Sequence, residues 1–222
     1  MNIVVGSAFR NSTHYLPRYF RQVDALRKHV DAMHSVRVIA VEGDSQDQTR
    51  KVLSQRPDVE ITDATHGGPV FGSTEDPKRM IQLSKVCNKV FESVKPLDDI
   101  FVYVESDLIW DPVVIGCLID LAAARKDGFD VFAPLVFAGQ NFYDIWGFRK
   151  DGVRFSPFPP YHAKMNGNLT EMESVGSCLV MRGEVARNCR IRNDYCLVGW
   201  CQDAQSQGYR IAVCPNLRIN HP

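Results

Sequence analysis

Our interpretation of the chain starts from one stretch, Asp99-Ile100-Phe101-Val102-Tyr103-Val104-Glu105-Ser106-Asp107-Leu108-Ile109-Trp110-Asp111-Pro112, in which an apolar run ends in acid. Residues 100–104 are all apolar or aromatic, which is typical of a buried strand in a parallel sheet. Glu105 and Asp107 follow and point to the same side of an extended backbone. Carboxylate oxygens suit Mg²⁺ or Mn²⁺, and open α/β sheets bind ligands beyond the carboxyl ends of their strands. A solvated acidic loop is the alternative that spacing alone leaves open.

Length and composition indicate one α/β domain. The chain has 222 residues, and 45% of them are hydrophobic, which is enough for a sizeable core. Lys plus Arg and Asp plus Glu number 26 each, so no global attraction to nucleic acid or to an anionic membrane is expected. No apolar run reaches the roughly 20 residues of a membrane helix. Seven scattered cysteines without a C-x-x-C motif or a secretory leader predict reduced thiols and a cytoplasmic location.

In residues 1–111, continuous apolar runs alternate with segments whose apolar residues recur at helical spacing. The expected strands are 2–8, 36–41, 59–62 and 100–104, and the expected helices are 16–34, 49–55 and 76–94. This alternation predicts a Rossmann-like, mostly parallel sheet flanked by helices. The first strand is not followed by G-x-G-x-x-G, and the glycine-rich stretch 66–73 lacks the Gly-Lys-Ser/Thr of a phosphate loop. A dinucleotide cofactor is therefore not expected, and 66–73 is interpreted as a flexible connector.

The second half continues the same domain. Its expected elements are a helix at 112–125, strands at 129–137, 173–182 and 209–213, a helix at 183–188 and another ending at 207. Between them, residues 141–170 are rich in aromatics, prolines and glycines, which is typical of a mobile lid or binding loop. Its rings suit stacking on a sugar or base, or packing against the sheet. We therefore expect a nucleotide-binding half, 1–111, and an acceptor-binding half, 112–222, in a single domain.

Four short motifs, in this order, resemble those of the GT-A fold of nucleotide-sugar glycosyltransferases, including family-2-like and mannosyltransferase members. Glu42-Gly43-Asp44-Ser45-Gln46-Asp47-Gln48-Thr49 resembles their turn after the second strand. Glu105-Ser106-Asp107 stands in the place of their D-x-D metal motif. Gly199-Trp200-Cys201-Gln202-Asp203 is similar to their G-W-x-E-D segment, with Gln202 in place of Glu. Ile219-Asn220-His221 resembles a late histidine that completes the metal site in several such families.

The resemblance implies a role for each matched residue. The nucleotide-sugar would contact Ser7, Ala8, Arg10, Glu42, Asp44, Arg79, Glu105 and Ser106; a divalent Mn or Mg ion would bind Asp107 and His221; and the catalytic base would be Asp203. Arginine offers a fork of donors for phosphate oxygens, although Arg79 also suits a solvated helix face. Asp203 likewise suits a helix cap, and His221 stands near the chain end.

The expected function is therefore metal-dependent transfer of a sugar from a nucleotide-sugar donor to a hydroxyl acceptor, with inversion if Asp203 is the base. Retention stays open, as does a non-catalytic nucleotide-sugar or carbohydrate-binding protein. Another alternative is a bacteriophage-type enzyme that glycosylates hydroxylated bases in DNA. It would use a basic rim beside the aromatic rings, formed by Arg149, Lys150, Arg154 and Lys164.

Overall fold

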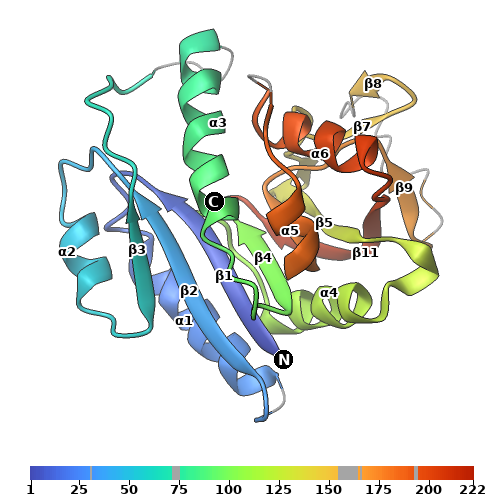
Figure 1. Ribbon diagram of the computed structural model, residues 1–222, viewed down its shortest axis with the longest axis horizontal. Helices are drawn as coiled ribbons and strands as arrows, with labels where there is room; N and C mark the ends of the chain where they lie inside the picture. Colours follow the sequence, from blue (N-terminus) through green and yellow to red (C-terminus); the bar gives the residue numbers. More distant parts are fainter. Residues whose placement is uncertain (31, 72–75, 155–164, 166, 193–194) are drawn as a thin grey trace.

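The computed structural model describes residues 1–30, 32–71, 76–154, 165, 167–192 and 195–222. Its centre is a nine-stranded sheet with the strand order β3-β2-β1-β4-β10-β5-β11-β9, to which β6 adds beside β5 (Figure 1). A separate two-stranded hairpin is formed by β7 and β8. The architecture confirms the predicted mixed α/β class with a central sheet flanked by helices.

The strands are β1 (Asn2–Phe9), β2 (Ser35–Glu42), β3 (Val59–Asp63), β4 (Ile100–Val104), β5 (Val131–Ala138), β6 (Asn141–Phe142), β7 (Arg149–Lys150), β8 (Val153–Arg154), β9 (Thr170–Met172), β10 (Cys178–Arg182) and β11 (Ile211–Asn220). The helices are α1 (Leu16–His29), α2 (Thr49–Ser54), α3 (Pro77–Glu92), α4 (Pro112–Ala124), α5 (Gly183–Asn188) and α6 (Cys196–Ser206), with a 3₁₀ turn at Lys126–Gly128.

Strand direction changes in the middle of the sheet. β3, β2, β1 and β4 run parallel to one another, and β11 runs parallel to β5. β10 lies between β4 and β5 and is antiparallel to both. The parallel prediction is therefore confirmed for the first half, where each strand is followed by a helix that returns the chain to the same edge.

Alternate residues of the strands face two separate cores, as the two-residue period of a strand requires. On one face, Val4 and Tyr103 belong to a cluster covered by α3, α5 and α6. On the other face, Val5 and Val102 belong to a cluster covered by α1, α2 and α4. Because both faces are buried, the central strands lack polar alternation, which explains the continuous apolar runs in the sequence.

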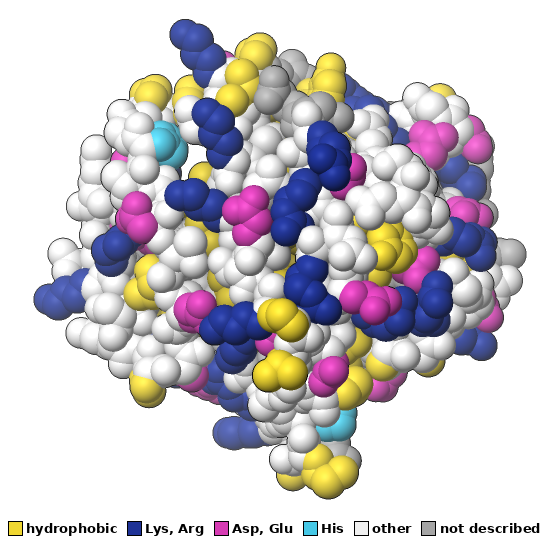
Figure 2. All heavy atoms as spheres, in the orientation of Figure 1, with side chains coloured by type: hydrophobic (Ala, Val, Ile, Leu, Met, Phe, Trp, Pro, Cys, Tyr) yellow, Lys and Arg dark blue, Asp and Glu magenta, His cyan; other side chains and the backbone are white. Residues whose placement is uncertain are grey.

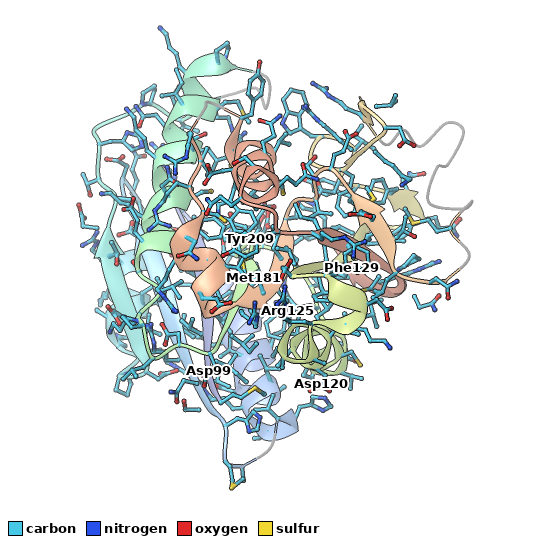
Figure 3. All side chains as sticks on the ribbon, turned by 45° about the vertical axis from the view of Figure 1, so that its right-hand side comes forward. Asp99, Asp120, Arg125, Phe129, Met181 and Tyr209 are labelled. Atoms are coloured by element: carbon cyan, nitrogen blue, oxygen red, sulfur yellow. The ribbon has the colours of Figure 1, made fainter. Side chains whose placement is uncertain are left out.

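Aromatic stacking joins α3 to α6 over the first of these cores. The Phe91 ring stacks on Trp200 at 5.0 Å between centroids and on Tyr103 at 5.7 Å. Figure 3 shows Met181 of β10 and Tyr209, after α6, within the same layer near α5. Stacked pairs of this kind add about 0.5–1.5 kcal/mol each to the burial of the rings. The beginning of α6 is thus held beside α3, where both helices line a cavity described below.

Three expected elements differ in extent. The first helix ends at His29, because the backbone of Val30 is extended; Met33, further along, is 85% exposed. The strand expected at 173–182 covers only β10; Ser177 just before it has a φ of 57°, outside the β region. The last strand extends to Asn220, with a register shift between Cys214 and Arg218.

The surface and the thiols show further properties. Basic and acidic side chains are intermixed over the face seen in Figure 2. Among the described residues, no helix combines the length and apolar character needed to cross a bilayer. The seven cysteines are free thiols.

Candidate active site

Three parallel strand ends form the base of the site. The register pairs Phe9 of β1 with Glu42 of β2, and Gly6 of β1 with Tyr103 of β4. The residues that follow these strands therefore meet at one edge of the sheet, next to antiparallel β10. A change of strand direction of this kind opens a crevice at which α/β proteins bind ligands.

The end of β11 brings His221 to Asp107. Ile109 and Asn220 exchange two backbone hydrogen bonds of 2.7 and 2.8 Å, and the His221 amide donates to Phe137 O at 2.7 Å. As a result His221 Nε2 lies 3.3 Å from Asp107 Oδ2. The marked C-terminus lies beside β4 in Figure 1. The Tyr143 ring stacks on the imidazole at 3.9 Å and an interplanar angle of 16°.

The geometry of this pair fits a divalent cation. His221 Nδ1 is 3.1 Å from Pro222 O; a proton donated there leaves the Nε2 lone pair facing the Asp107 carboxylate, and two such acceptors need a cation or a proton between them. Ligands about 2.1 Å from an octahedral ion and at right angles lie roughly 3 Å apart. The described residues offer no group of three or more metal-binding side chains. An ion held by the pair would complete its shell with water or substrate oxygens, as Mg²⁺ commonly does.

A first cavity of about 290 Å³ lies between the end of β1, the 64–71 segment and α3. Four of the matched positions or their neighbours line it: Ala8, Arg10, Gly43 and Arg79. A Cβ on Gly43 would lie 2.3 Å from the Ala64 carbonyl carbon, so only glycine fits there.

The described part of the glycine-rich stretch, 66–71, forms a wall of this first cavity, which corrects its interpretation as a simple connector. Arg10 donates to Gly68 O at 2.8 Å and to Pro69 O at 3.1 Å. The Asp44 carboxylate accepts from the amides of His66, at 3.1 Å, and Gly67, at 3.0 Å. These backbone donors, first that of His66, lower the pKa of Asp44. Asp44 thus shapes the wall through the backbone.

Other predicted nucleotide contacts lie behind the cavity. Ser7 is fully buried, and its hydroxyl donates to Val104 O at 2.6 Å, which ties β1 to β4. Glu42 is also buried and accepts from Arg50 Nε at 2.5 Å. Ser106 is partly buried between the two acidic residues of its motif. Neither Ser7 nor Glu42 lines the first cavity; the structure places both as supports of the strand ends.

A second cavity of about 490 Å³ shares Arg79 and Leu83 with the first. Its other lining residues come from α3, the end of β4, the turn after β6, the turn before β10 and the start of α6: Met80, Glu105, Tyr143, Asp144, Ile145, Trp146, Gly147, Gly176, Ser177, Tyr195, Cys196, Leu197 and Val198. Because Tyr143 also stacks on His221, this cavity lies beside the Asp107–His221 pair.

Glu105 and Asp144 are two carboxyl groups in this second cavity. Desolvation, followed by the charges of Asp144 and Asp107, raises the pKa of Glu105 to about 8. Desolvation also raises the pKa of Asp144 to about 6, although hydrogen bonding by Ser177 and the Gly147 amide favours its charged form. The Ser177 hydroxyl has one proton and can satisfy only one of the two carboxylates at a time.

Asp203 is not brought to either cavity. Its carboxylate accepts from the Arg190 amide at 2.8 Å, from Arg192 Nε at 2.5 Å and from Gln207 Nε2 at 3.0 Å. Desolvation opposes ionisation, but these donors lower the pKa of Asp203. The α6 residues that line the second cavity are instead 196–198, in its first turn. Asp203 therefore holds the segment before α6 in this structure.

Comparison with known proteins gives similarity in structure alone. No protein-family model and no curated protein sequence matches the chain. Among solved structures, S. aureus TarS with UDP-GlcNAc aligns over 99% of this chain at a TM-score of 0.58 and 14% identity. A Pyrobaculum calidifontis mannosyltransferase with GDP-Man and Mn²⁺ aligns over 98% at 0.61 and 11% identity. Mycobacterium tuberculosis glucosyl-3-phosphoglycerate synthase with Mn²⁺, UDP and glucosyl-3-phosphoglycerate aligns over 100% at 0.53 and 15% identity.

The chain has the GT-A fold. Each of these three neighbours is a glycosyltransferase, and each alignment includes nearly every residue of this chain. The chain spans 58% of the TarS structure, 56% of the mannosyltransferase and 72% of the synthase. This GT-A domain thus corresponds to part of each neighbour.

One residue of the GT-A site was not expected from the sequence. Asp144 stands between Tyr143 and Ile145 in an aromatic stretch that we interpreted as a lid. The available signal was a single carboxylate within a run of apolar residues, which is costly to bury without a partner or a ligand. The lid itself stays a prediction: Phe142, Asp144 and Phe148 are buried, and residues 155–164 and 166 lie outside those that the structure describes.

Proposed function

We propose that this GT-A domain is a metal-dependent glycosyltransferase that moves a sugar from a nucleotide-sugar to a hydroxyl acceptor. The observation that carries the proposal is the 3.3 Å approach of His221 Nε2 to Asp107 Oδ2. The pair lies beside the second cavity, which shares Arg79 with the first. A pair of cation ligands beside one cavity, and a basic side chain where that cavity meets the other, suit a nucleoside diphosphate sugar.

Each part of the donor has a place in this proposal. The nucleoside enters the first cavity, against Ala8, Arg10 and the wall that Asp44 holds. The diphosphate lies at Arg79, and the sugar enters the second cavity beside Glu105. The solved neighbours support this order, since TarS was captured with UDP-GlcNAc and the archaeal mannosyltransferase with GDP-Man and Mn²⁺.

The chemistry requires stabilisation of a leaving diphosphate. A divalent cation held by Asp107 and His221 would supply Lewis-acid stabilisation of the charge that develops on it. Arg79 adds a second positive group from the side of α3, with donors suited to phosphate oxygens. The Tyr143 ring restrains the His221 imidazole by stacking, so that Nε2 keeps facing Asp107. These residues orient the diphosphate and neutralise its charge, which lowers the barrier to cleavage of the bond between the sugar and the diphosphate.

We keep Asp203 as the proposed general base of an inverting reaction, with one condition. To accept the hydroxyl proton, the Asp203 carboxylate must lose one of the hydrogen bonds that it now accepts. The bond from Arg192 is the one that can be lost, because the Arg192 side chain is 68% exposed and free to move into solvent. The acceptor hydroxyl would then replace Arg192 as a hydrogen-bond donor, so that the buried carboxylate is not left without a partner. Retention is the alternative, in which Asp203 keeps its structural contacts.

The acceptor is proposed only as a hydroxyl compound. Stacking on a sugar or base was one of the two alternatives for the rings of this stretch, but the Trp146 ring is covered by the Arg154 guanidinium at 3.9 Å. Basic and acidic side chains are mixed over the visible face (Figure 2), so no observation there favours DNA. Lys164, the remaining member of the expected rim with Arg149 and Lys150, lies outside the described residues.

Calorimetric titration of UDP and GDP with Mn²⁺ tests the proposal. One of the two should bind, and EDTA should weaken its binding. Asp107→Asn should lower the affinity by at least about 10–100-fold, as loss of metal-site partners commonly does. Asp111→Asn is the matched control, because Asp111 only caps α4 through the Val113 amide at 2.8 Å, and Asn caps nearly as well. Full nucleotide affinity in Asp107→Asn with Mn²⁺ present would overturn the proposed site.

A further inference from the structure

Asp144 is a buried carboxylate that the proposed mechanism does not use. It is only 6% exposed, yet it lines the second cavity together with Glu105. Its Oδ1 accepts from the Gly147 amide at 3.2 Å. The nearby Ser177 side chain also favours its charged form, but Oδ2 is buried and receives no hydrogen bond of good geometry from any described residue. A buried carboxylate oxygen without a partner is costly, so its place in a cavity wall points to a ligand that supplies the missing donor.

Two glycines leave room for this carboxylate. A Cβ on Gly147 would lie 2.8 Å from Asp144 Oδ1, and a Cβ on Gly176 would lie 2.8 Å from Oδ2. Any other residue at either position would displace the carboxylate from the cavity wall. The neighbouring Ser177 adopts a φ of 57°, in the left-handed region that is uncommon for serine. The backbone on both sides of the carboxylate is thus shaped around it.

The described residues of the second cavity include two carboxyl groups and one basic side chain. The ionisable lining residues are Arg79, Glu105, Tyr143, Asp144, Tyr195 and Cys196. Arg79 is the one basic side chain among the described lining residues, and it also lines the first cavity, where the diphosphate would engage it. The inner part of the second cavity therefore presents two carboxyl groups and no basic side chain of its own among the described residues.

We propose that Asp144 accepts a hydrogen bond from a hydroxyl group of the donor sugar and thereby selects uncharged sugars over sugars that carry a carboxylate. This inference rests on the proposed function. A sugar hydroxyl supplies the donor that Oδ2 lacks, in a charge-assisted hydrogen bond. A uronic acid would instead place a second carboxylate beside that of Asp144, where like charges repel strongly because little water screens them. Asp144 is thus a specificity-determining residue of the donor site.

The test compares two donors that differ in one group. With Mn²⁺ present, UDP is titrated beside UDP-glucose and UDP-glucuronate; if only GDP binds, GDP-mannose and GDP-mannuronate replace them. The wild-type protein should bind the neutral donor about 10-fold or more tightly than the uronate, because hydrogen bonds to charged groups contribute that much. Asp144→Asn should reduce this preference to about twofold and leave the affinity for the nucleoside diphosphate unchanged.

Gly176→Ala is a second variant that keeps the carboxylate but displaces it, and it should reduce the same preference. Gly152→Ala is its control, since a Cβ there meets open space and any cost of its positive φ is remote from Asp144. Equal affinity of the wild-type protein for neutral donor and uronate would overturn the inference. The inference would also be overturned if Asp144→Asn bound the donor with full affinity but lost transfer, because Asp144 would then contact the acceptor. Failure of both UDP and GDP to bind would overturn the proposed function itself.

Discussion

Helix α6 and the turn after β6 each bury one aspartate in the C-terminal half, and the two carboxylates have opposite surroundings. Asp203 on α6 is 8% exposed and Asp144 in the turn is 6% exposed. Asp203 accepts from a backbone amide, an arginine and a glutamine side chain. Asp144 accepts from the Gly147 amide and is favoured in its charged form by Ser177, and its Oδ2 has no partner of good hydrogen-bond geometry in the described part of the chain. The pKa of Asp203 is lowered and that of Asp144 is raised to about 6.

This comparison shows that burial alone does not decide the state of a carboxylate. Desolvation raises the pKa of both groups, but only at Asp203 do the donors outweigh it. A fully satisfied carboxylate stabilises the fold, whereas an unsatisfied one in a cavity wall is available to a ligand. The segment before α6 is therefore fastened by its aspartate, while the turn after β6 presents its aspartate to the second cavity.

The largest effect is expected on transfer when Asp203 is changed. Asp203→Asn keeps an oxygen for the Arg190 amide but removes the base, so turnover should fall by about 10²–10⁴-fold. Transfer to a panel of hydroxyl acceptors, including DNA with hydroxylated bases, would be read by mass spectrometry. Donor affinity should be unchanged, because Asp203 lines neither cavity.

Arg192→Ala is the control for the release of Asp203. It removes a guanidinium that is itself 68% exposed and should leave transfer at or above the wild-type rate, since the Asp203 carboxylate becomes more basic without it. Normal turnover in Asp203→Asn would show that the residue only fastens the segment before α6. The anomeric configuration of the product, read by NMR coupling constants, would then be examined for retention.

A smaller but opposite pair of effects is expected in the pH dependence of stability. The pKa of Asp144 is raised from 3.8 to about 6, so the folded state binds this proton more tightly than the unfolded state. The free energy of unfolding should therefore fall as the pH rises from about 4 to about 6, by on the order of 3 kcal/mol. Denaturant titrations with EDTA, in which Asp144→Asn is compared with the wild type, measure this difference.

Asp203 should show the reverse sign in the same titrations. Its lowered pKa contributes stability that is present above the unfolded pKa and is lost as the pH falls through the folded one. Asp203→Asn should thus be less stable than the wild type near pH 7, and the gap should close in acid. If both variants responded to pH in the same direction, the contrast between the two carboxylates would be wrong.

The two regions also differ in how far the sequence could predict them. The ends of β1, β2 and β4 were placed correctly. Buried parallel strands have continuous apolar sequences, and their carboxyl ends lie at the same edge of the sheet. The approach of His221 to Asp107 followed from the same logic with the matched motifs. Asp144 was missed, because its position depends on the nonlocal meeting of two glycine-containing turns around residues 147 and 176, which no local periodicity encodes.

Asp203 illustrates the complementary limit. The motif resemblance implied a role for Asp203, and helical spacing placed it on a helix. Neither shows which groups donate hydrogen bonds to its carboxylate. Its partners Arg190 and Arg192 lie in an irregular segment before α6. Side-chain partners from irregular segments are fixed by tertiary packing, so the sequence alone left cap and base equally open.

The smallest predicted effect concerns Tyr143, which joins the turn after β6 to the proposed metal pair. Its ring stacks on His221 at 3.9 Å, and stacking of this kind contributes about 0.5–1.5 kcal/mol. Tyr143→Ala frees the imidazole to rotate away from Asp107, so the apparent affinity for Mn²⁺ in the presence of nucleotide should fall by about 2–10-fold. Tyr143→Phe retains the ring and should bind Mn²⁺ as the wild type does. Equal losses in both variants would assign the effect to the hydroxyl group, and no loss in either would show that the backbone contact of His221 with Phe137 is sufficient to hold the ligand.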